Sequence, residues 1–272
     1  MTKSIKLSKI RIYPIKSLDF VELDEAQTGT HSLQHDREFA MFSADGRYVN
    51  GKRTGRVNQL HAQYDLENYS LSLGERGDAK RETFELREGN PKLNEYLSDF
   101  FELDIHLSHN KKGELQDMPK VGSVTVVSKA SLVELHEKFP EISLEDFRQR
   151  FRINLELDGM EAYEEENLFR SKAENNAVKF SIGEVEMFGL SPRARCSVPP
   201  RNPLTGEADK TFVKSFMDKR LEMLNDSCLL NEYPNPYYLS INTFMAENQD
   251  GKKLCLGDSF RVLGKESIAN LF

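Results

Sequence analysis

The sequence predicts a β-rich α+β protein, in which an N-terminal barrel-like β region packs closely against a larger region of mixed helices and strands. In the first region, short runs with strand-like alternation recur about every ten residues, which is typical of a β-barrel or a sheet folded on itself. Near residues 88–105 the pattern changes to alternating helices and strands, with no flexible linker. We therefore expect two domains, residues 1–95 and 96–272.

Strands account for the first region. Residues 5–12 alternate apolar and polar side chains irregularly, and Pro14 ends the pattern because proline cannot donate to a strand ladder. A strand at 35–42 is followed by Asp45-Gly46, a favoured two-residue turn, which predicts a hairpin. The remaining expected strands are 20–23, 58–66, 69–73 and 82–86.

Helices enter with the second region. Asn90-Pro91 can begin one, since proline is tolerated at the first helical position and apolar residues then follow helical spacing to Phe101. Ser128 and Ser143 are the expected N-caps of helices at 129–138 and 143–150. Residues 209–224 predict an irregular helix. The strands expected here are 121–127, 152–157, 178–188 with a turn at Gly183, 237–243 and 254–262.

The charge balance restricts the class of partner. The 37 basic and 44 acidic residues give a net charge of −7, which argues against a nucleic-acid-binding protein, whose affinity comes mainly from neutralising phosphates. No stretch predicts a membrane span or a secretory signal, and three widely spaced cysteines are no disulfide framework. These observations favour a cytoplasmic location.

Residues 193–207, RARCSVPPRNPLTGE, place Cys196 on a stiff, proline-rich loop. Arg193, Arg195 and Arg201 surround it, and nearby cations favour the reactive, metal-binding thiolate over the thiol. The alternative is an inert, buried cysteine, which a polar loop disfavours. By contrast, Cys228 and Cys255 are expected to be structural, and Cys255 to lie in the core.

Several other residues are candidates for binding an anion. Arginine offers a planar fork that matches phosphate, and lysine offers a point charge. For any one of them, a surface ion pair is the ordinary alternative. No glycine-rich phosphate loop occurs, and the six histidines do not show the spacing of a zinc site. The candidates are Lys16, Ser17, Arg37, Arg152, Asn154 and Arg195.

Taken together, these motifs resemble those of MOSC-domain proteins that carry an N-terminal MOSC β-barrel domain. The similar segments, in the same order along nearly the whole chain, are IYPIKS (12–17), DREF (36–39), FRINLELDG (151–159), GEVEM (183–187), RCSVPPRNPLTGE (195–207) and LGDSF (256–260). The resemblance implies that the second region is a MOSC domain, a β-barrel with helices.

The resemblance also implies a molybdenum cofactor (molybdopterin) site. Cys196 would be the metal ligand and the catalytic residue, and a thiolate is a soft ligand suited to such a metal. The residues implied as cofactor contacts are Lys16, Ser17, Arg37, Arg152, Asn154, Arg195 and Tyr238. The resemblance also implies pyridoxal phosphate binding, as a property associated with the family as a whole.

The implied activity is the reduction of N-hydroxylated or related N-oxygenated small molecules, as in the amidoxime-reducing component and its bacterial counterparts. Three cysteines cannot hold an iron–sulfur cluster of the four-cysteine kind, so no fused ferredoxin domain is expected. Electrons would come from a separate ferredoxin-, flavin- or cytochrome-type reductase.

The chain departs from the family pattern at Ile153, Leu168 and Ala194, and in two segments, 120–124 and 199–202. The second segment, PPRN, is expected on the substrate side and implies an altered specificity. Two alternatives therefore stay open: a sulfur or cofactor carrier that uses Cys196, and a non-catalytic scaffold that has lost the site.

Overall fold

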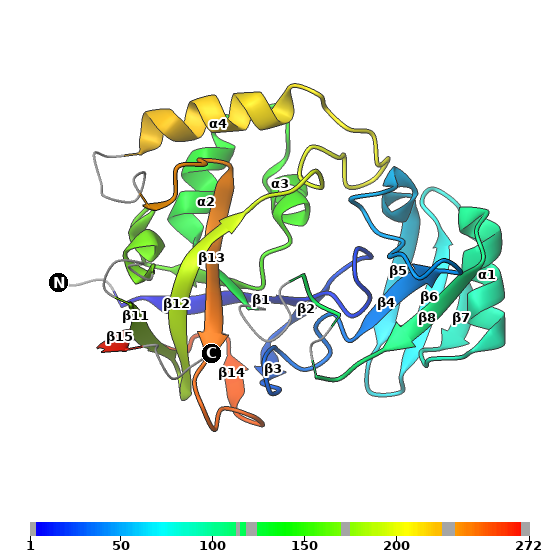
Figure 1. Ribbon diagram of the computed structural model, residues 1–272, viewed down its shortest axis with the longest axis horizontal. Helices are drawn as coiled ribbons and strands as arrows, with labels where there is room; N and C mark the ends of the chain where they lie inside the picture. Colours follow the sequence, from blue (N-terminus) through cyan, green and yellow to red (C-terminus); the bar gives the residue numbers. More distant parts are fainter. Residues whose placement is uncertain (1–3, 113–114, 118–123, 170–174, 225–231, 268–272) are drawn as a thin grey trace.

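A computed structural model describes residues 4–112, 115–117, 124–169, 175–224 and 232–267. The β-rich α+β fold is confirmed, with two lobes lying side by side (Figure 1). We call residues 39–109 the small lobe and the other described residues the large lobe. The first strands of the large lobe are β1 (Lys6–Ile12), β2 (Val21–Leu23) and β3 (Glu25–Gln27).

The small lobe contains one α-helix and two small sheets, β4–β8 and β5–β6–β7. Among its described strands, the pairing does not close into a barrel. Its core combines the inner faces of these sheets with Leu93, Leu97 and Phe101 of the helix. The elements are β4 (Phe39–Ser43), η1 (Gly55–Asn58), β5 (Leu60–Asp65), β6 (Ser70–Glu75), β7 (Glu82–Glu85), α1 (Pro91–Phe101) and β8 (Ile105–His109).

The large lobe is built on an eight-stranded sheet with the order β15-β11-β12-β13-β9-β10-β1-β2. Its remaining elements are β9 (Thr125–Ser128), α2 (Lys129–His136), α3 (Leu144–Phe151), β10 (Leu155–Asp158), η2 (Glu164–Leu168), β11 (Asn176–Ile182), β12 (Val185–Ala194), α4 (Phe212–Met223), β13 (Tyr238–Met245), β14 (Lys253–Cys255) and β15 (Phe260–Ser267).

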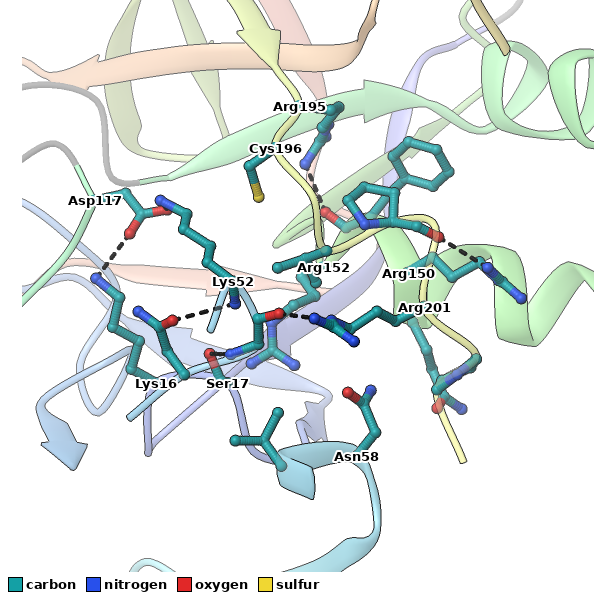
Figure 2. Close-up of a pocket in the computed structure, with 18 of the residues that line it drawn as sticks. Lys16, Ser17, Lys52, Asn58, Asp117, Arg150, Arg152, Arg195, Cys196 and Arg201 are labelled. Atoms are coloured by element: carbon teal, nitrogen blue, oxygen red, sulfur yellow. Dashed lines mark hydrogen bonds and ion pairs between the residues drawn. The ribbon is translucent and has the colours of Figure 1, made fainter. Parts of the chain in front are cut away.

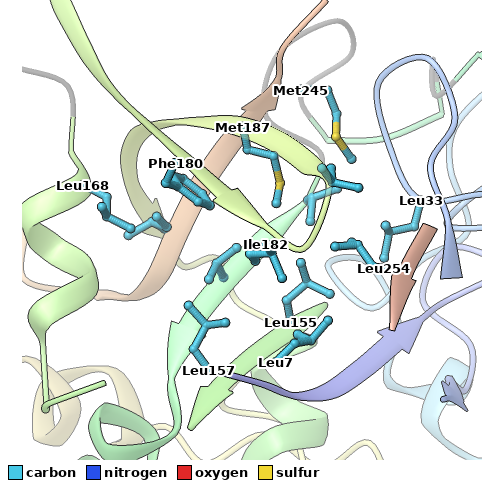
Figure 3. Packing of buried hydrophobic residues seen from close by; sticks show 14 of the residues in the cluster. Leu7, Leu33, Leu155, Leu157, Leu168, Phe180, Ile182, Met187, Met245 and Leu254 are labelled. Atoms are coloured by element: carbon cyan, nitrogen blue, oxygen red, sulfur yellow. The ribbon is translucent and has the colours of Figure 1, made fainter. Parts of the chain in front are cut away.

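Two packed cores support this sheet. Aliphatic and aromatic side chains from strands that are distant in sequence meet in one core, among them Leu7, Leu155 and Phe180 (Figure 3). A second core, rich in phenylalanine, joins α2, α3 and α4, with Phe139, Phe147 and others fully buried. The first core includes residues of β12 and the second includes residues of α3. Packing therefore fixes the positions of these two elements within the large lobe.

Local capping signals are confirmed. Asn90 caps α1 ahead of Pro91, and its side chain accepts a hydrogen bond from the Leu93 amide. Ser128 and Ser143 cap α2 and α3 by accepting from the amides of Ala130 and Asp146. Each bond satisfies an amide that has no partner within the helix, and such a cap contributes about 1 kcal/mol.

Several expected strands are shorter, for identifiable reasons. The strand expected at 35–42 begins only at Phe39, because His35 and Arg37 adopt positive φ angles in a turn. The strand expected at 152–157 begins at Leu155, because Arg152 has a left-handed conformation that ends α3. The range 254–262 holds two strands, β14 and β15, separated at Gly257 with a φ of 90°.

Other expectations have mixed outcomes. The turn at Gly183 forms between β11 and β12. The turn at Asp45-Gly46 also forms, but β4 then pairs mainly with β8 instead of with the residues after the turn. The strand expected at 121–127 is described only from residue 124, and β9 begins at Thr125.

The N-terminal strands belong to the large lobe. β1 lies beside β10 in the large sheet, and β3 pairs with β14 near the other end of the chain. The expected division between residues 95 and 96 stays a prediction. Those positions lie within α1, which packs with β8 in the core of the small lobe.

Candidate functional site

A cavity of about 300 Å³ lies between the two lobes. The small lobe contributes residues 50–58, including η1. The large lobe contributes the turn after β1, the C-terminal end of α3 and the loop after β12 (Figure 2). Clefts between lobes are common places for small-molecule sites. This cleft brings together residues that are up to about 190 positions apart in the chain.

The lining is strongly cationic, although the whole chain has a net charge of −7. Among the described lining residues there is one carboxylate, Asp117, against eight cationic side chains. Such a lining attracts an anionic ligand, because low-dielectric walls strengthen each interaction. The cations are Lys16, Arg37, Lys52, Arg150, Arg152, Arg193, Arg195 and Arg201.

The turn after β1 presents Lys16 and Ser17. The Lys16 amide donates to the Phe39 carbonyl at 2.8 Å, which ties this turn to the start of β4. Ser17 has a φ of 74°, and its hydroxyl accepts a hydrogen bond from the Gly51 amide at 3.1 Å (Figure 2). The turn therefore connects the two lobes at the pocket itself.

Arg37 and Arg152 pack around the buried ring of Tyr13. Their guanidinium carbons lie 4.7 and 4.1 Å from the ring centroid. Arg37 pairs with Asp36 and donates to the Arg152 carbonyl at 3.2 Å, whereas Arg152 donates to the Leu18 carbonyl at 2.8 Å. Burial lowers the pKa of Arg152 from its usual value. A backbone carbonyl and an aromatic face thus hold both arginines, and Arg37 is held in addition by the carboxylate of Asp36.

Arg195 follows the end of β12. Its guanidinium donates to the Phe151 carbonyl and the Ser240 hydroxyl, both at 2.7 Å, and to the Leu239 carbonyl. Burial, together with the neighbouring Arg193, lowers the pKa of Arg195 to about 9. Its Nε is buried and has no hydrogen-bond partner. Burying a cation in this way is unfavourable unless an anion joins it.

Cys196 is the next residue and is exposed, with its thiol free. The side chain lines the cavity beside Arg195 (Figure 2). An exposed thiol at the wall of a cationic pocket is not a packing residue. The expectation that this cysteine is accessible rather than structural therefore agrees with its position.

On another wall, Asp117 gathers three of the cations. Its carboxylate lies 2.7 Å from Lys16 Nζ, 3.2 Å from Lys52 Nζ and 3.7 Å from Arg193 Nη2. Burial alone would raise the pKa of Asp117, but Lys16, Lys52 and Arg193 hold it well below its usual range. Asp117 is therefore a built-in counter-ion for part of the pocket.

The loop after Cys196 is clamped to the small lobe. Arg201 donates through Nε to the Gly51 carbonyl at 2.8 Å and through Nη1 to the Gly206 carbonyl at 3.0 Å. The backbones of Gly55 and Gly206 approach so closely that a Cβ on Gly206 would lie 2.0 Å from the Gly55 carbonyl oxygen. The loop that follows the cysteine is thereby held across the cleft.

Six of the eight expected site residues come together in the pocket: Lys16, Ser17, Arg37, Arg152, Arg195 and Cys196. The other two do not line it. Asn154 is buried behind the wall, where its Oδ1 lies 3.4 Å from Arg37 Nη1 and also accepts from Thr125. Tyr238 is buried on β13, against Phe169 and the guanidinium of Arg220.

Sequence reasoning missed Lys52, Asn58, Asp117 and Arg150 as lining residues. Lys52 and Asn58 come from a segment with no motif, and Asp117 from a polar stretch. Arg150 could have been predicted, because it directly precedes the FRIN segment (151–154) at the end of an amphipathic helix. Its position two residues before Arg152 could have indicated the same wall.

Cys255 and the six histidines do not line the pocket. Cys255 is half-buried on β14, contrary to the expectation that it lies in the core, because this strand pairs only with β3. Cys228 lies outside the described residues. Among the residues that the structure describes, no group of three or more His, Cys, Asp or Glu side chains could hold a metal ion.

Of the segments that depart from the family pattern, residues 120–123 lie outside the described part of the chain. Leu168 is buried, and Ala194 lines the pocket. In the PPRN segment, Pro199 and Arg201 line the pocket, while the Asn202 side chain accepts from the Leu204 and Thr205 amides. This segment therefore builds a defined loop against the small lobe.

Comparison with known families matches residues 4–111 to the MOSC N-terminal beta barrel domain. The matched region includes the small lobe, β1 and the turn that carries Lys16 and Ser17. It also includes Arg37 and Lys52, so three of the pocket's eight cations lie within it.

Curated relatives are similar over most of the chain. The human protein named molybdenum cofactor sulfurase is 22% identical over 91% of this chain, and the protein of that name from Caenorhabditis briggsae is 24% identical over 76%. The chain spans about a third of the length of these relatives.

Among solved structures, the YuaD protein from Bacillus subtilis is 11% identical, with a TM-score of 0.40 and 95% of both chains covered. Separately, no helix formed by the described residues is long and apolar enough to cross a membrane.

Proposed function

Because residues 4–111 match the MOSC N-terminal beta barrel domain, we propose that this chain binds the molybdenum cofactor in the cleft between its lobes. With it, the protein reduces N-hydroxylated or related N-oxygenated small molecules. The observation that carries the proposal is an exposed cysteine, Cys196, on the wall of a pocket with eight cations and one described carboxylate. In this proposal residues 96–272 are the MOSC domain.

The residues present fit such a cofactor. A pterin phosphate requires cationic and hydroxyl donors, which Lys16, Ser17 and Arg37 provide from the N-terminal side. Arg195 has a buried Nε without a partner, so an anionic ligand would remove an unfavourable burial. The thiolate of Cys196 is a soft ligand of the kind that molybdenum accepts alongside other sulfur ligands.

The other expected site residues would have separate roles. Arg152 and Arg195, held by backbone carbonyls, would present fixed positive charge without having to reorganise. Asn154 would act as a positioning residue, since it contacts Arg37 and not the cavity. Tyr238, which lies outside the lining, has no direct role in this proposal.

When bound, the cofactor would supply a redox-active metal for the reduction of the substrate. Cleavage of an N–O bond with release of water consumes two electrons and two protons. The three cysteines of this sequence cannot form a four-cysteine iron–sulfur cluster. In this proposal a separate protein donates the electrons, and the location is cytoplasmic.

A second candidate function is supported by the similarity to proteins named molybdenum cofactor sulfurase. Here Cys196 would carry sulfur: its thiolate would take the terminal sulfur of a donor persulfide, and the donor would leave as a thiol. The exposure of Cys196 fits this function equally well. The chain spans only about a third of the length of those relatives, and this candidate assigns it the sulfur-transfer step alone.

Expression in a host that makes the cofactor tests the proposal. Purified protein should contain about one molybdenum and one pterin per chain, and it should reduce an N-hydroxylated amidine when a reductase supplies electrons. Cys196→Ser should lower that activity at least about a hundredfold, equivalent to some 3 kcal/mol.

The matched control is Cys255→Ser, the same change at a half-buried cysteine outside the pocket, and it should keep the activity. Absence of molybdenum, or equal activity of wild type and Cys196→Ser, would contradict the reductase function. A persulfide on Cys196 seen by intact mass, without reductase activity, would instead support the second candidate.

A further inference from the structure

The pocket holds more positive charge than the proposed cofactor contacts account for. Four lining cations lie outside that set: Lys52, Arg150, Arg193 and Arg201. Lys52 and Arg193 share the carboxylate of Asp117. Arg150 and Arg201 have no carboxylate within 4.0 Å among the described residues. This uncompensated pair requires an explanation.

Arg150 projects from the last turn of α3. Its Nη1 donates to the Pro199 carbonyl at 2.8 Å, and its guanidinium carbon lies 5.5 Å from the ring centroid of Phe212. Its Nε is buried and unpartnered. Burial lowers the pKa of Arg150 even though Asp146 and Asp209 act in the opposite direction. This guanidinium thus keeps donor capacity and charge that the described protein does not use.

Arg201 lies on the same loop, two residues after Pro199. Its hydrogen bonds to Gly51 and Gly206 use carbonyl oxygens, which are neutral, so its charge also stays uncompensated. Those bonds fix the side chain at the cleft between the lobes (Figure 2). Backbone carbonyls hold both arginines in place, so little side-chain entropy remains to be lost when an anion binds.

An acceptor accompanies these donors. Asn58, on η1, lines the same cavity, and its Oδ1 is buried without a partner. A buried acceptor that lacks a partner favours a ligand with an N–H or O–H group. An N-hydroxylated amidine has both kinds of donor, whereas Arg150 requires an anionic oxygen.

We infer that the substrate carries an anionic oxygen group, carboxylate or phosphate, that binds Arg150 beside Arg201. The N-oxygenated end of this substrate rests on the proposed function. The anionic end goes beyond that function. A planar guanidinium matches both groups through paired hydrogen bonds. The substrate class is therefore an N-oxygenated acid instead of a neutral amidine.

Binding calorimetry on the purified full chain tests this with three probes: benzamidoxime and its 4-carboxy and 4-phosphono derivatives. One charge-assisted contact corresponds to about a tenfold difference in affinity, so we expect at least one charged probe to bind wild type about tenfold more tightly than the neutral one. This preference should decrease as sodium chloride is raised. Equal affinity for all three probes, or a preference that salt leaves unchanged, overturns the inference.

Arg150→Gln should reduce the preference to about twofold or less while the variant stays folded by circular dichroism. Arg87→Gln is the matched control, because it removes the same charge from an exposed arginine of the small lobe and should keep the full preference. A preference retained in Arg150→Gln overturns the placement at Arg150.

Molybdenum content of the same preparations separates the two proposals. Molybdenum-free protein that still prefers a charged probe supports the anion site and contradicts the proposed cofactor function. A molybdenum-loaded reductase that shows no preference for a charged probe supports the proposed cofactor function and contradicts the anion site.

Discussion

Two walls of the pocket differ in how their charge is balanced. On the wall formed by Lys16, Lys52 and Arg193, all three cations lie within 4 Å of Asp117. On the opposite wall, the guanidinium groups of Arg150 and Arg195 donate mainly to backbone carbonyls. The first wall carries its own anion, and the second has none among the described residues.

The difference separates two ways of preparing a site for an anion. At the Asp117 wall, an incoming anion has to compete with an internal carboxylate, so binding there gains less. At the carbonyl-braced wall, the charges are held in place without being neutralised, and the incoming anion supplies the missing counter-charge. We therefore expect the second wall to contribute more to the affinity for an anion, and the first wall to limit the total positive field.

The largest expected effect comes from disrupting the contact between the lobes, on which both walls depend. In Gly206→Ala the new Cβ would lie 2.0 Å from the Gly55 carbonyl oxygen, and the φ of 77° is strained for alanine. We expect the free energy of unfolding to fall by about 3 kcal/mol, measured by urea denaturation.

Gly77→Ala is the matched control, since Gly77 has a φ of 89° but an added Cβ meets nothing within 4 Å. This variant has the backbone strain without the steric clash, and its free energy of unfolding should fall by only about 1 kcal/mol. Equal losses in the two variants would show that the contact between the lobes contributes nothing.

A smaller effect follows from removing the internal anion. Asp117→Asn leaves Lys16, Lys52 and Arg193 without their shared carboxylate. We expect inorganic phosphate to bind about tenfold more tightly, measured by calorimetry at low salt. Asp45→Asn, which removes an exposed carboxylate paired with Arg47, should leave phosphate affinity unchanged. An unchanged affinity in Asp117→Asn would mean that Asp117 does not compete with the anion.

The smallest expected effect is a dependence on pH. Because the folded-state pKa of Asp117 is depressed, its carboxylate stabilises the fold fully above the unfolded-state pKa of about 4. That stabilisation is lost as the pH falls toward the folded-state pKa. The difference in unfolding free energy between wild type and Asp117→Asn should therefore be larger at neutral pH than at acid pH. A difference that does not change with pH would argue against the ion pairs as its source.

Short-range features of the fold were predictable from sequence. The caps at Asn90, Ser128 and Ser143 depend on residues within three positions of one another, so a local pattern suffices. Cys196 was identifiable because its loop cannot be a helix or a central strand. Positive φ angles at His35 and Arg37 were not predictable, because the surrounding tertiary contacts impose them.

The sequence by itself determined the chemistry available to this protein: an accessible thiol, the motif arginines and the order of the segments that carry them. Only the tertiary structure decided which of these groups meet. It moved Asn154 behind the wall, left Tyr238 out, and brought Lys52, Asp117 and Arg150 in. The reason is physical, since the pocket forms where two lobes close on each other, and contacts across more than a hundred residues depend on packing that no local pattern encodes.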